Sequence, residues 1–237
     1  MKNTVAKIAL VLVLSCSPLS HLEAAQNSPV ELSADTIEYN SAQDIIIANG
    51  NVSIVQEKAE MTGSHAEYNS KTKEAYLTGG VRVVKEDATL LAAEVRSYDN
   101  THMVATGNPV LTQGESTLTG PSIDYYSDKQ YAIVTGWAKL TTSDSVMTAN
   151  QIESFFNENR AVAQDNVHIT SSARQLDATA DQAVYYSSKG EQGKTVLSGN
   201  ARAIQEGNTL TGNTMTLYLD KKSIDVQGRS KLIIIPQ

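Results

Sequence analysis

The 237-residue sequence contains one cysteine, five prolines and only 5% aromatic residues. With Cys16 as the single cysteine, the chain forms no internal disulfide, and it has no thiol cluster to hold zinc. Since Phe, Trp and Tyr are scarce, the core must be built from Val, Ile, Leu and Ala. The same scarcity argues against a stacking platform for single-stranded nucleic acid.

Positive charge is also in short supply. The chain carries 19 Lys and Arg against 26 Asp and Glu, a formal net charge of −7. A protein that binds the phosphate backbone needs clustered Lys and Arg, so we expect no nucleic-acid partner. A hydrophobic fraction of 41% is too high for a disordered chain and is sufficient for one large all-β domain or two small ones.

The first 25 residues resemble an export signal. Lys2 and Lys7 precede the apolar run 8–14, and small residues end at Ala25, which is typical of a cleaved signal peptide over residues 1–25. A run of this length cannot cross a bilayer, which takes about 20 apolar residues, and no later segment approaches that length. A second interpretation stays open, in which cleavage before Cys16 leaves a lipidated N-terminus.

The remaining residues, 26–237, consist of seven repeats of about 29 residues. Each repeat opens with an apolar residue, then Ser, Thr or Ala, then a small residue, and an aromatic side chain follows about seven residues later. The openings are Leu32, Met61, Leu91, Leu118, Met147, Ala178 and Leu210, and the aromatic residues are Tyr39, Tyr68, Tyr98, Tyr125, Phe155, Tyr185 and Tyr218.

A turn similar to Gly50-Asn51-Val52 recurs in the middle of each repeat, and strict alternation of aliphatic and polar residues follows it. A period of two is typical of half-buried strands, and no useful window has the 3.6-residue period of a helix. We therefore expect an all-β fold of roughly 14–18 antiparallel strands, stacked into a jellyroll or solenoid-like sandwich.

The alternation also predicts which residues face the interior. Ordinary core packing is the commoner role for any single one of them, but as a set they are the candidates for an aliphatic groove: Val30, Leu32, Val52, Ile54, Val81, Val83, Leu91, Val110, Leu118, Leu140, Met147, Val167, Ile169 and Leu210. The first and last strands are apolar where natural sheet edges usually carry charge, so another chain is expected to dock on Val30, Leu32, Leu232, Ile233, Ile234 and Ile235.

Catalytic patterns are missing. The four histidines are scattered without metal-ligand spacing, no nucleophile elbow is present, and the segment 190–195 lacks the first glycine of a phosphate-binding loop. Acidic residues such as Asp99 and Glu158 recur at equivalent turns, which indicates turn chemistry rather than a catalytic pair. We expect no enzyme activity, no metal and no cofactor.

Two phrases, 32–56 (LSADTIEYN…ANGNVSIVQ) and 118–140 (LTGPSIDYYSD…VTGWAKL), are similar to the OstA-like family of periplasmic lipopolysaccharide-transport proteins, the LptA family. The likeness covers residues 30–235. It implies an elongated, slightly twisted open β-jellyroll that carries lipopolysaccharide across the periplasm. It also implies an LptC-like inner-membrane partner, the N-terminal domain of an LptD-like outer-membrane barrel as the other partner, and end-to-end self-association. By the same resemblance, Val30 and Leu32 match positions that contact lipid.

Alternatives remain at this point. A structural or adhesive β-solenoid would have a fully packed interior, and an envelope assembly scaffold would bind proteins through its edges without a lipid ligand. The repeats form either one continuous jellyroll or two segments that meet near residues 143–150.

Overall fold

The computed structural model describes residues 29–56, 58–99, 101–187, 193–218 and 223–235. The expected signal peptide and Cys16 lie outside these residues. The chain divides into two compact units, the first comprising residues up to 114 with 122–130, and the second residues 115–121 with 131–237. The chain divides within residues 114–131, so residues 143–150 lie inside the second unit.

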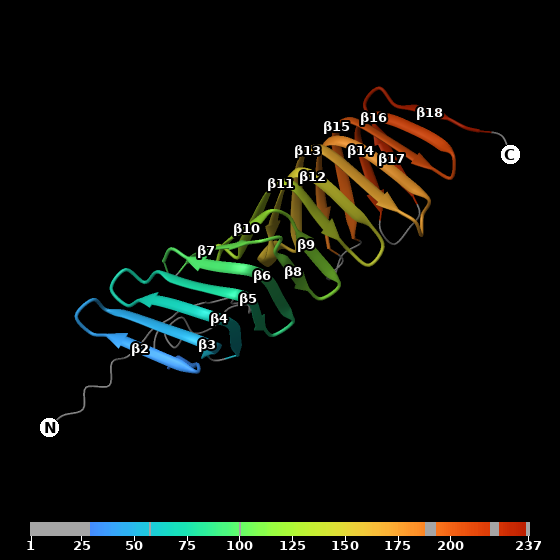
Figure 1. Ribbon diagram of the computed structural model, residues 1–237. Coiled ribbons are helices and arrows are strands. Elements are labelled where there is room, and N and C mark those ends of the chain that lie inside the picture. Colours follow the sequence, from blue (N-terminus) through green and yellow to red (C-terminus); the bar gives the residue numbers. More distant parts are fainter. Residues whose placement is uncertain (1–28, 57, 100, 188–192, 219–222, 236–237) are drawn as a thin grey trace. The chain divides into compact units, whose positions relative to one another are not determined.

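The described residues of unit 1 form nine antiparallel strands, and Figure 1 shows how they are arranged. The short strands β1 and β2 both pair with β3, β3 to β6 pair in chain order, and β6 pairs with β7 and β8. β10 pairs with β7. The bounds are β1 Glu31–Ser33, β2 Thr36–Asn40, β3 Ile45–Gln56, β4 Ala59–Asn69, β5 Ala75–Lys85, β6 Ala88–Ser97, β7 His102–Thr106, β8 Val110–Gln113 and β10 Ser122–Tyr126.

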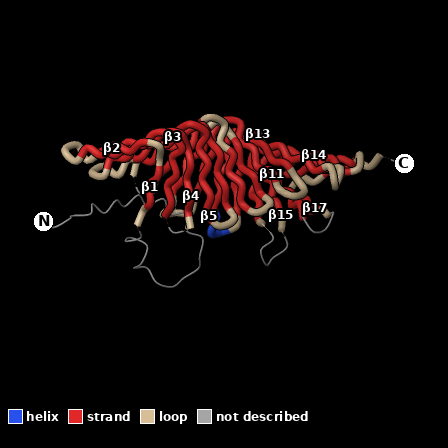
Figure 2. Tube along the Cα trace, turned by 60° about the horizontal axis from the view of Figure 1, so that its bottom comes forward, coloured by secondary structure: helices blue, strands red, loops and turns tan. Residues whose placement is uncertain are grey.

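Unit 2 has the same organisation, and Figure 2 shows that almost all of its described trace is strand. β9 pairs with β11, β11 to β16 pair in chain order, and β16 pairs with both β17 and β18. The bounds are β9 Ser116–Thr119, β11 Tyr131–Thr141, β12 Val146–Phe155, a 3-10 helix η2 Phe156–Glu158, β13 Arg160–Ser171, β14 Leu176–Tyr186, β15 Lys194–Gln205, β16 Asn208–Tyr218, β17 Ile224–Gln227 and β18 Lys231–Ile233. The all-β, antiparallel jellyroll expected from the sequence is confirmed.

The Gly-Asn motifs, expected as turns, do not reverse the chain. Most of them lie within a long strand, where the register with the neighbouring strand shifts, and we call these positions corners. In β3, the register with β4 shifts between Asn49 and Val52, and the two residues between them have φ of +74° and +45°. Glycine and asparagine adopt this left-handed conformation at the lowest cost. Each repeat has such a pair of consecutive residues with positive φ: 50 and 51, 79 and 80, 107 and 108, 136 and 137, 165 and 166, 199 and 200, and 228 and 229.

The neighbouring strand explains the small residue that opens each repeat. A Cβ atom on Gly63 of β4 would lie 2.8 Å from the carbonyl oxygen of Thr78, so only glycine fits at this position without a shift of the backbone. In the first repeat, the residue after the small one also contacts the corner. The carboxylate of Asp35, which follows Ala34, accepts a hydrogen bond from the Asn51 side-chain amide at 3.0 Å. Asn200 and Asp181 repeat this contact at 2.9 Å. Each corner therefore depends on residues of two adjacent strands. This is why the Gly-Asn pair and the small residue near the opening of each repeat recur with the same spacing.

The opening of the third repeat lies one residue earlier in the structure than the repeat spacing in the sequence predicts. Leu90, not Leu91, pairs with Val83, and Leu91 pairs with Arg82 and Val110 on the outer face. The expected inward placement of Leu91, which is 46% exposed, and of the half-buried Val110 is therefore wrong. Because side chains alternate, an error of one residue moves a side chain to the other face of the sheet. The residues that face inward here are Pro109 and Leu111.

The acidic turn residue Asp99 shows what the recurrent acids do. Its carboxylate accepts hydrogen bonds from the backbone N–H groups of Thr101 at 2.6 Å and His102 at 2.7 Å, and from the Thr101 hydroxyl at 2.9 Å. The two backbone N–H groups contribute most, followed by the Thr101 hydroxyl, and together they lower the pKa of Asp99 from its ordinary value. The expectation of turn chemistry is confirmed at this position.

Replacing Asp99 by Asn is expected to destabilise unit 1 near neutral pH by roughly 1 kcal/mol or less, because the charged acceptor is lost. The folded pKa is depressed, so the Asp99 contribution is present above its unfolded-state pKa of about 3.9 and is lost as the pH falls through the lower folded value. The difference between the two proteins in urea midpoint should therefore shrink as the pH falls below about 4. A difference that stays constant from pH 7 to pH 2 would contradict this.

Candidate functional site

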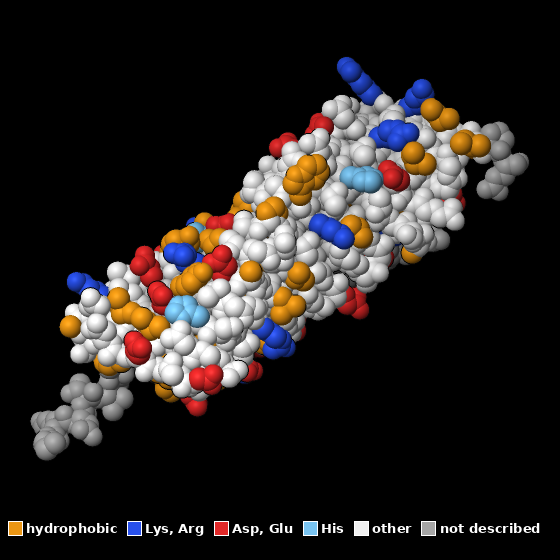
Figure 3. Space-filling view, viewed as in Figure 1, with side chains coloured by type: hydrophobic (Ala, Val, Ile, Leu, Met, Phe, Trp, Pro, Cys, Tyr) orange, Lys and Arg blue, Asp and Glu red, His pale blue; other side chains and the backbone are white. Residues whose placement is uncertain are grey.

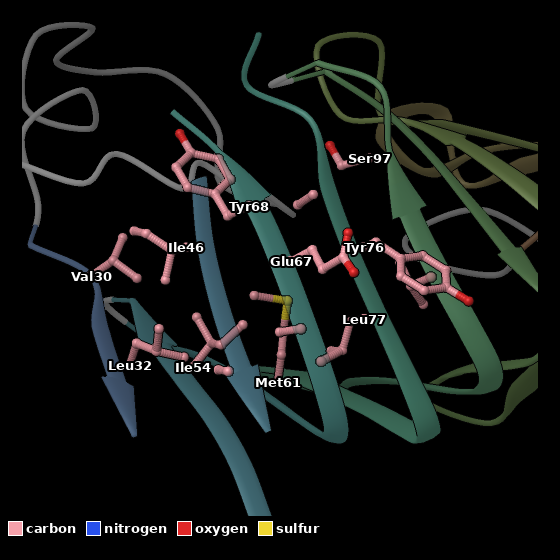
Figure 4. A pocket seen from close by; sticks show the side chains of 14 residues that line it. Val30, Leu32, Ile46, Ile54, Met61, Glu67, Tyr68, Tyr76, Leu77 and Ser97 are labelled. Atoms are coloured by element: carbon pink, nitrogen blue, oxygen red, sulfur yellow. The ribbon is translucent and has the colours of Figure 1, made fainter. Parts of the chain in front are cut away.

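The interior of unit 1 contains an apolar cavity (Figure 4). It is an open groove with a cavity volume of about 50 Å³, and about 600 Å³ of empty space lies between its walls when the part open to solvent is included. Val30, just before β1, and Leu32 within it line the cavity, and Ile46 and Ile54 reach it from the two halves of β3, on either side of the corner. The bend at the corner lets a single strand supply two walls of the same space. The rest of the lining is Ala48, Met61, Ala66, Glu67, Tyr68, Ala75, Tyr76, Leu77, Val95 and Ser97.

Tyr68 of β4 and Ser97 of β6 lie at one end of this cavity, and Glu67 and Tyr76 lie at its side, with the Tyr76 ring pointing away from the aliphatic side chains. Burial raises the pKa of the Tyr68 hydroxyl. The Tyr76 hydroxyl donates to the Glu94 carboxylate at 2.6 Å, and this hydrogen bond raises the pKa of Tyr76. Both phenols therefore stay neutral at ordinary pH, and the cavity offers aliphatic walls with an uncharged aromatic side chain at its end.

The structure brings three of the predicted groove residues, Val30, Leu32 and Ile54, to the cavity itself. Leu210 is half-buried, and the others, apart from Leu91 and Val110, are buried in the interior of their unit: Val52, Val81, Val83, Leu118, Leu140, Met147, Val167 and Ile169. The sequence reasoning missed Ile46, Met61 and Leu77 as wall residues. It followed the alternation after each corner, whereas Ile46 and Leu77 precede a corner; continuing the same alternation backwards would have found them.

The last strand presents apolar side chains to solvent. β18 pairs with β16 through Leu210↔Leu232 and Thr209↔Ile233. Leu232, Ile233 and the two residues after them are all exposed, by 47% to 66%. Successive residues of a strand point to opposite faces, so both faces of this segment are apolar. Elsewhere, on the face seen in Figure 3, hydrophobic side chains form small groups among polar ones.

The part of the chain that the structure describes has no helix long and apolar enough to cross a membrane. The same residues include no group of three or more His, Cys, Asp or Glu side chains placed to hold a metal ion.

Comparisons with known proteins give two family matches. The family described as LptA/(LptD N-terminal domain) LPS transport protein matches residues 60–160 and 94–223, and a family of OstA-like proteins matches residues 19–93. No curated protein sequence matches the chain. Among solved structures, LptH of Pseudomonas aeruginosa, described as the LptA homologous periplasmic component of the lipopolysaccharide transport device, is 14% identical.

The LptH alignment covers 88% of this chain and 96% of that one, but its TM-score of 0.18 is too low to carry an argument. The family matches are sufficient without it, because the first alone spans residues 60–223, more than half of the sequence. The chain therefore belongs to the family of LptA and LptD N-terminal-domain lipopolysaccharide transport proteins.

Proposed function

We propose that this protein binds the acyl chains of lipopolysaccharide in the interior of its jellyroll and passes the lipid along a periplasmic bridge from the inner to the outer membrane. The observation that carries the proposal is the apolar cavity of unit 1. Proteins of this family are transport proteins and not enzymes, so binding and transfer are the chemistry to explain.

The energetics favour such a cavity as a lipid site. Each CH₂ group removed from water contributes about 0.8 kcal/mol, so a 12-carbon chain gains roughly 10 kcal/mol on entering an aliphatic interior. The repeats present similar aliphatic walls, so a chain can move from one to the next with little change in free energy. A fully packed solenoid, the structural alternative, would leave no such space in unit 1.

The exposed apolar segment 232–235 supports the second half of the proposal. An apolar strand edge accepts a strand of another protein by β-augmentation, which would continue the interior from one protein into the next. A second copy of this chain, an LptC-like partner and the N-terminal domain of an LptD-like barrel are the partners proposed for these edges.

Photo-crosslinking tests the lipid site. We expect a crosslinkable residue in place of Leu77, which lines the cavity, to give a covalent adduct when the mature protein is mixed with lipopolysaccharide micelles. The matched control is the same replacement at Leu91, also a leucine of unit 1 but exposed on the outer face. Equal labelling at both positions, or none at Leu77 in a folded protein, would refute an internal acyl site.

A further inference from the structure

Unit 2 contains a buried arginine that the lipid-binding proposal does not use. Arg174 lies in the hairpin 172–175, between β13 and β14, and is only 8% exposed. Among the described residues it is the one Lys or Arg that is buried. A buried guanidinium is costly unless it is paired and hydrogen-bonded, so its partners indicate what it holds together.

Those partners come from two other parts of unit 2. The Nη2 group donates to the carboxylate of Asp144, in the hairpin 142–145 between β11 and β12. The Nη1 group donates to the backbone carbonyl of Tyr218, the last residue of β16, at 2.9 Å. Charge-assisted hydrogen bonds of this kind are among the strongest in proteins. We call the group formed by Asp144, Arg174 and the Tyr218 carbonyl the mouth strap.

The strap connects opposite ends of the strands. In the register of the sheet, the start of β14 at Leu176 pairs with Gln205, and Gln205 pairs with Asn208, the first residue of β16. Tyr218 lies at the other end of this 11-residue strand, which would be roughly 30 Å away in a flat sheet. A 2.9 Å contact requires the two halves of the strands to fold over the interior at their corners, so that their ends meet.

A second pair of residues reports the same approach. Val146, at the start of β12, is in register with Thr170 and Asp177, whereas Tyr185 lies near the far end of β14. The charge of Asp144, two residues before Val146, nevertheless adds to burial in raising the pKa of Tyr185. We call the two sets of strand ends the rims of the jellyroll: the hairpins 142–145 and 172–175 lie on one rim, and Tyr185 and Tyr218 lie on the other. Asp144 and Arg174 thus reach from the first rim to the second, across the open side between them.

Loop length sets these two hairpins apart. The hairpins 86–87 in unit 1 and 206–207 in unit 2 lie at the same end of their strands and have two residues each, whereas 142–145 and 172–175 have four. The extra residues carry Asp144 and Arg174. In unit 1, where the equivalent hairpins are short, the interior contains the open cavity described above.

We infer that the mouth strap closes the lateral opening of unit 2 and must break before an acylated glycolipid can enter that unit. The inference rests on the proposed function. An acyl chain inside the jellyroll remains bonded to a polar headgroup outside it, so the linkage must pass between the two rims. A hydrogen-bonded guanidinium that joins the rims obstructs this passage. Arg174 is therefore a gating residue for the entry of lipid into unit 2.

The test compares rates of crosslinking in the two units of the intact mature protein, with purified lipopolysaccharide micelles as the probe. One crosslinkable residue replaces Val30 in unit 1, and in a separate protein another replaces Leu210 in unit 2. We expect Arg174→Ala to speed the appearance of adducts at position 210 by about tenfold or more, since charge-assisted hydrogen bonds contribute that much to an equilibrium. The rate at position 30 should not change.

Arg160→Ala is the matched control, because Arg160 forms an ion pair with Glu158 at 2.8 Å within one hairpin of the same unit and joins no rims. It should leave both rates unchanged. Adducts at position 30 with no acceleration at position 210 in Arg174→Ala would overturn the strap but not the lipid site. An absence of adducts at position 30 in every variant would overturn the proposed function and the strap with it.

Two further variants guard against a simple loss of folding. Arg174→Lys keeps the charge and a donor for the Tyr218 carbonyl, so it should restore most of the slow rate at position 210. Asp144→Asn keeps the arginine but removes its ion pair, and should accelerate position 210 less than Arg174→Ala does. If the lysine variant is as fast as the alanine variant while the asparagine variant is unchanged, the strap is not the gate.

Discussion

Replacing Ala66 by Leu is expected to remove most lipopolysaccharide binding while making the lipid-free protein more stable. Ala66 lines the cavity of unit 1 and is largely buried. A leucine there would project into the space proposed for an acyl chain. Filling a cavity typically adds about 0.5–2 kcal/mol to the free energy of unfolding. The opposite signs of the two effects separate a loss of binding from a loss of folding.

Native mass spectrometry of lipid-loaded protein and urea unfolding of lipid-free protein measure the two effects. Ala183→Leu in unit 2 is the control, because Ala183 is fully buried with no exposed surface. There the extra atoms should cause overpacking and a loss of about 1–3 kcal/mol. Undiminished lipid loading in Ala66→Leu would show that acyl chains do not occupy this cavity.

Gly63→Ala is expected to be strongly destabilising. The added Cβ would lie 2.8 Å from the Thr78 carbonyl oxygen and 2.9 Å from a methyl carbon of Leu77, so backbone must move at the corner between β4 and β5. Strain of this kind costs about 1–3 kcal/mol or more. Since a domain is stable by only about 5–15 kcal/mol, the urea midpoint should fall sharply.

Gly80→Ala provides the comparison at the same corner. Gly80 has φ of +78°, but a Cβ atom there meets nothing within 4 Å. Only the conformational cost of a left-handed non-glycine residue remains, about 1–2 kcal/mol. If the two variants lose the same stability, close packing at the corner is not what selects the small residue of each repeat.

Much of the fold could be predicted from the sequence because the repeat is local. Period-two alternation predicts a strand segment on each side of Gly50 and Asn51, and the spacing of the repeats predicts the number of such segments. The alternation cannot show that the two halves fold over one another, because a turn and a corner use the same residues. The third repeat was misplaced by one residue because Leu90 and Leu91 fit the opening equally well, and only pairing with Val83 distinguishes them.

The candidate site was harder to predict. Val30, Leu32 and Ile54 were expected at the groove, but the sequence gives no sign that the open space lies in unit 1. The strap was not predicted at all, since Asp144 and Arg174 are 30 residues apart and each looks like an ordinary polar loop residue. Their only signal in the sequence is the additional length of their two loops. Contacts across the mouth depend on the closure of the jellyroll, which no local pattern encodes.

The pairing of each long strand with its sequence neighbours also has an evolutionary consequence. Because β12 to β15 each pair only with the strands before and after them, a whole repeat can be duplicated or deleted without changing any remaining pair. One such event adds or removes two strands, about 10 Å of sheet at the usual strand separation. Genes for proteins of this kind can therefore lengthen or shorten the sheet in whole-repeat steps, by unequal recombination between repeats.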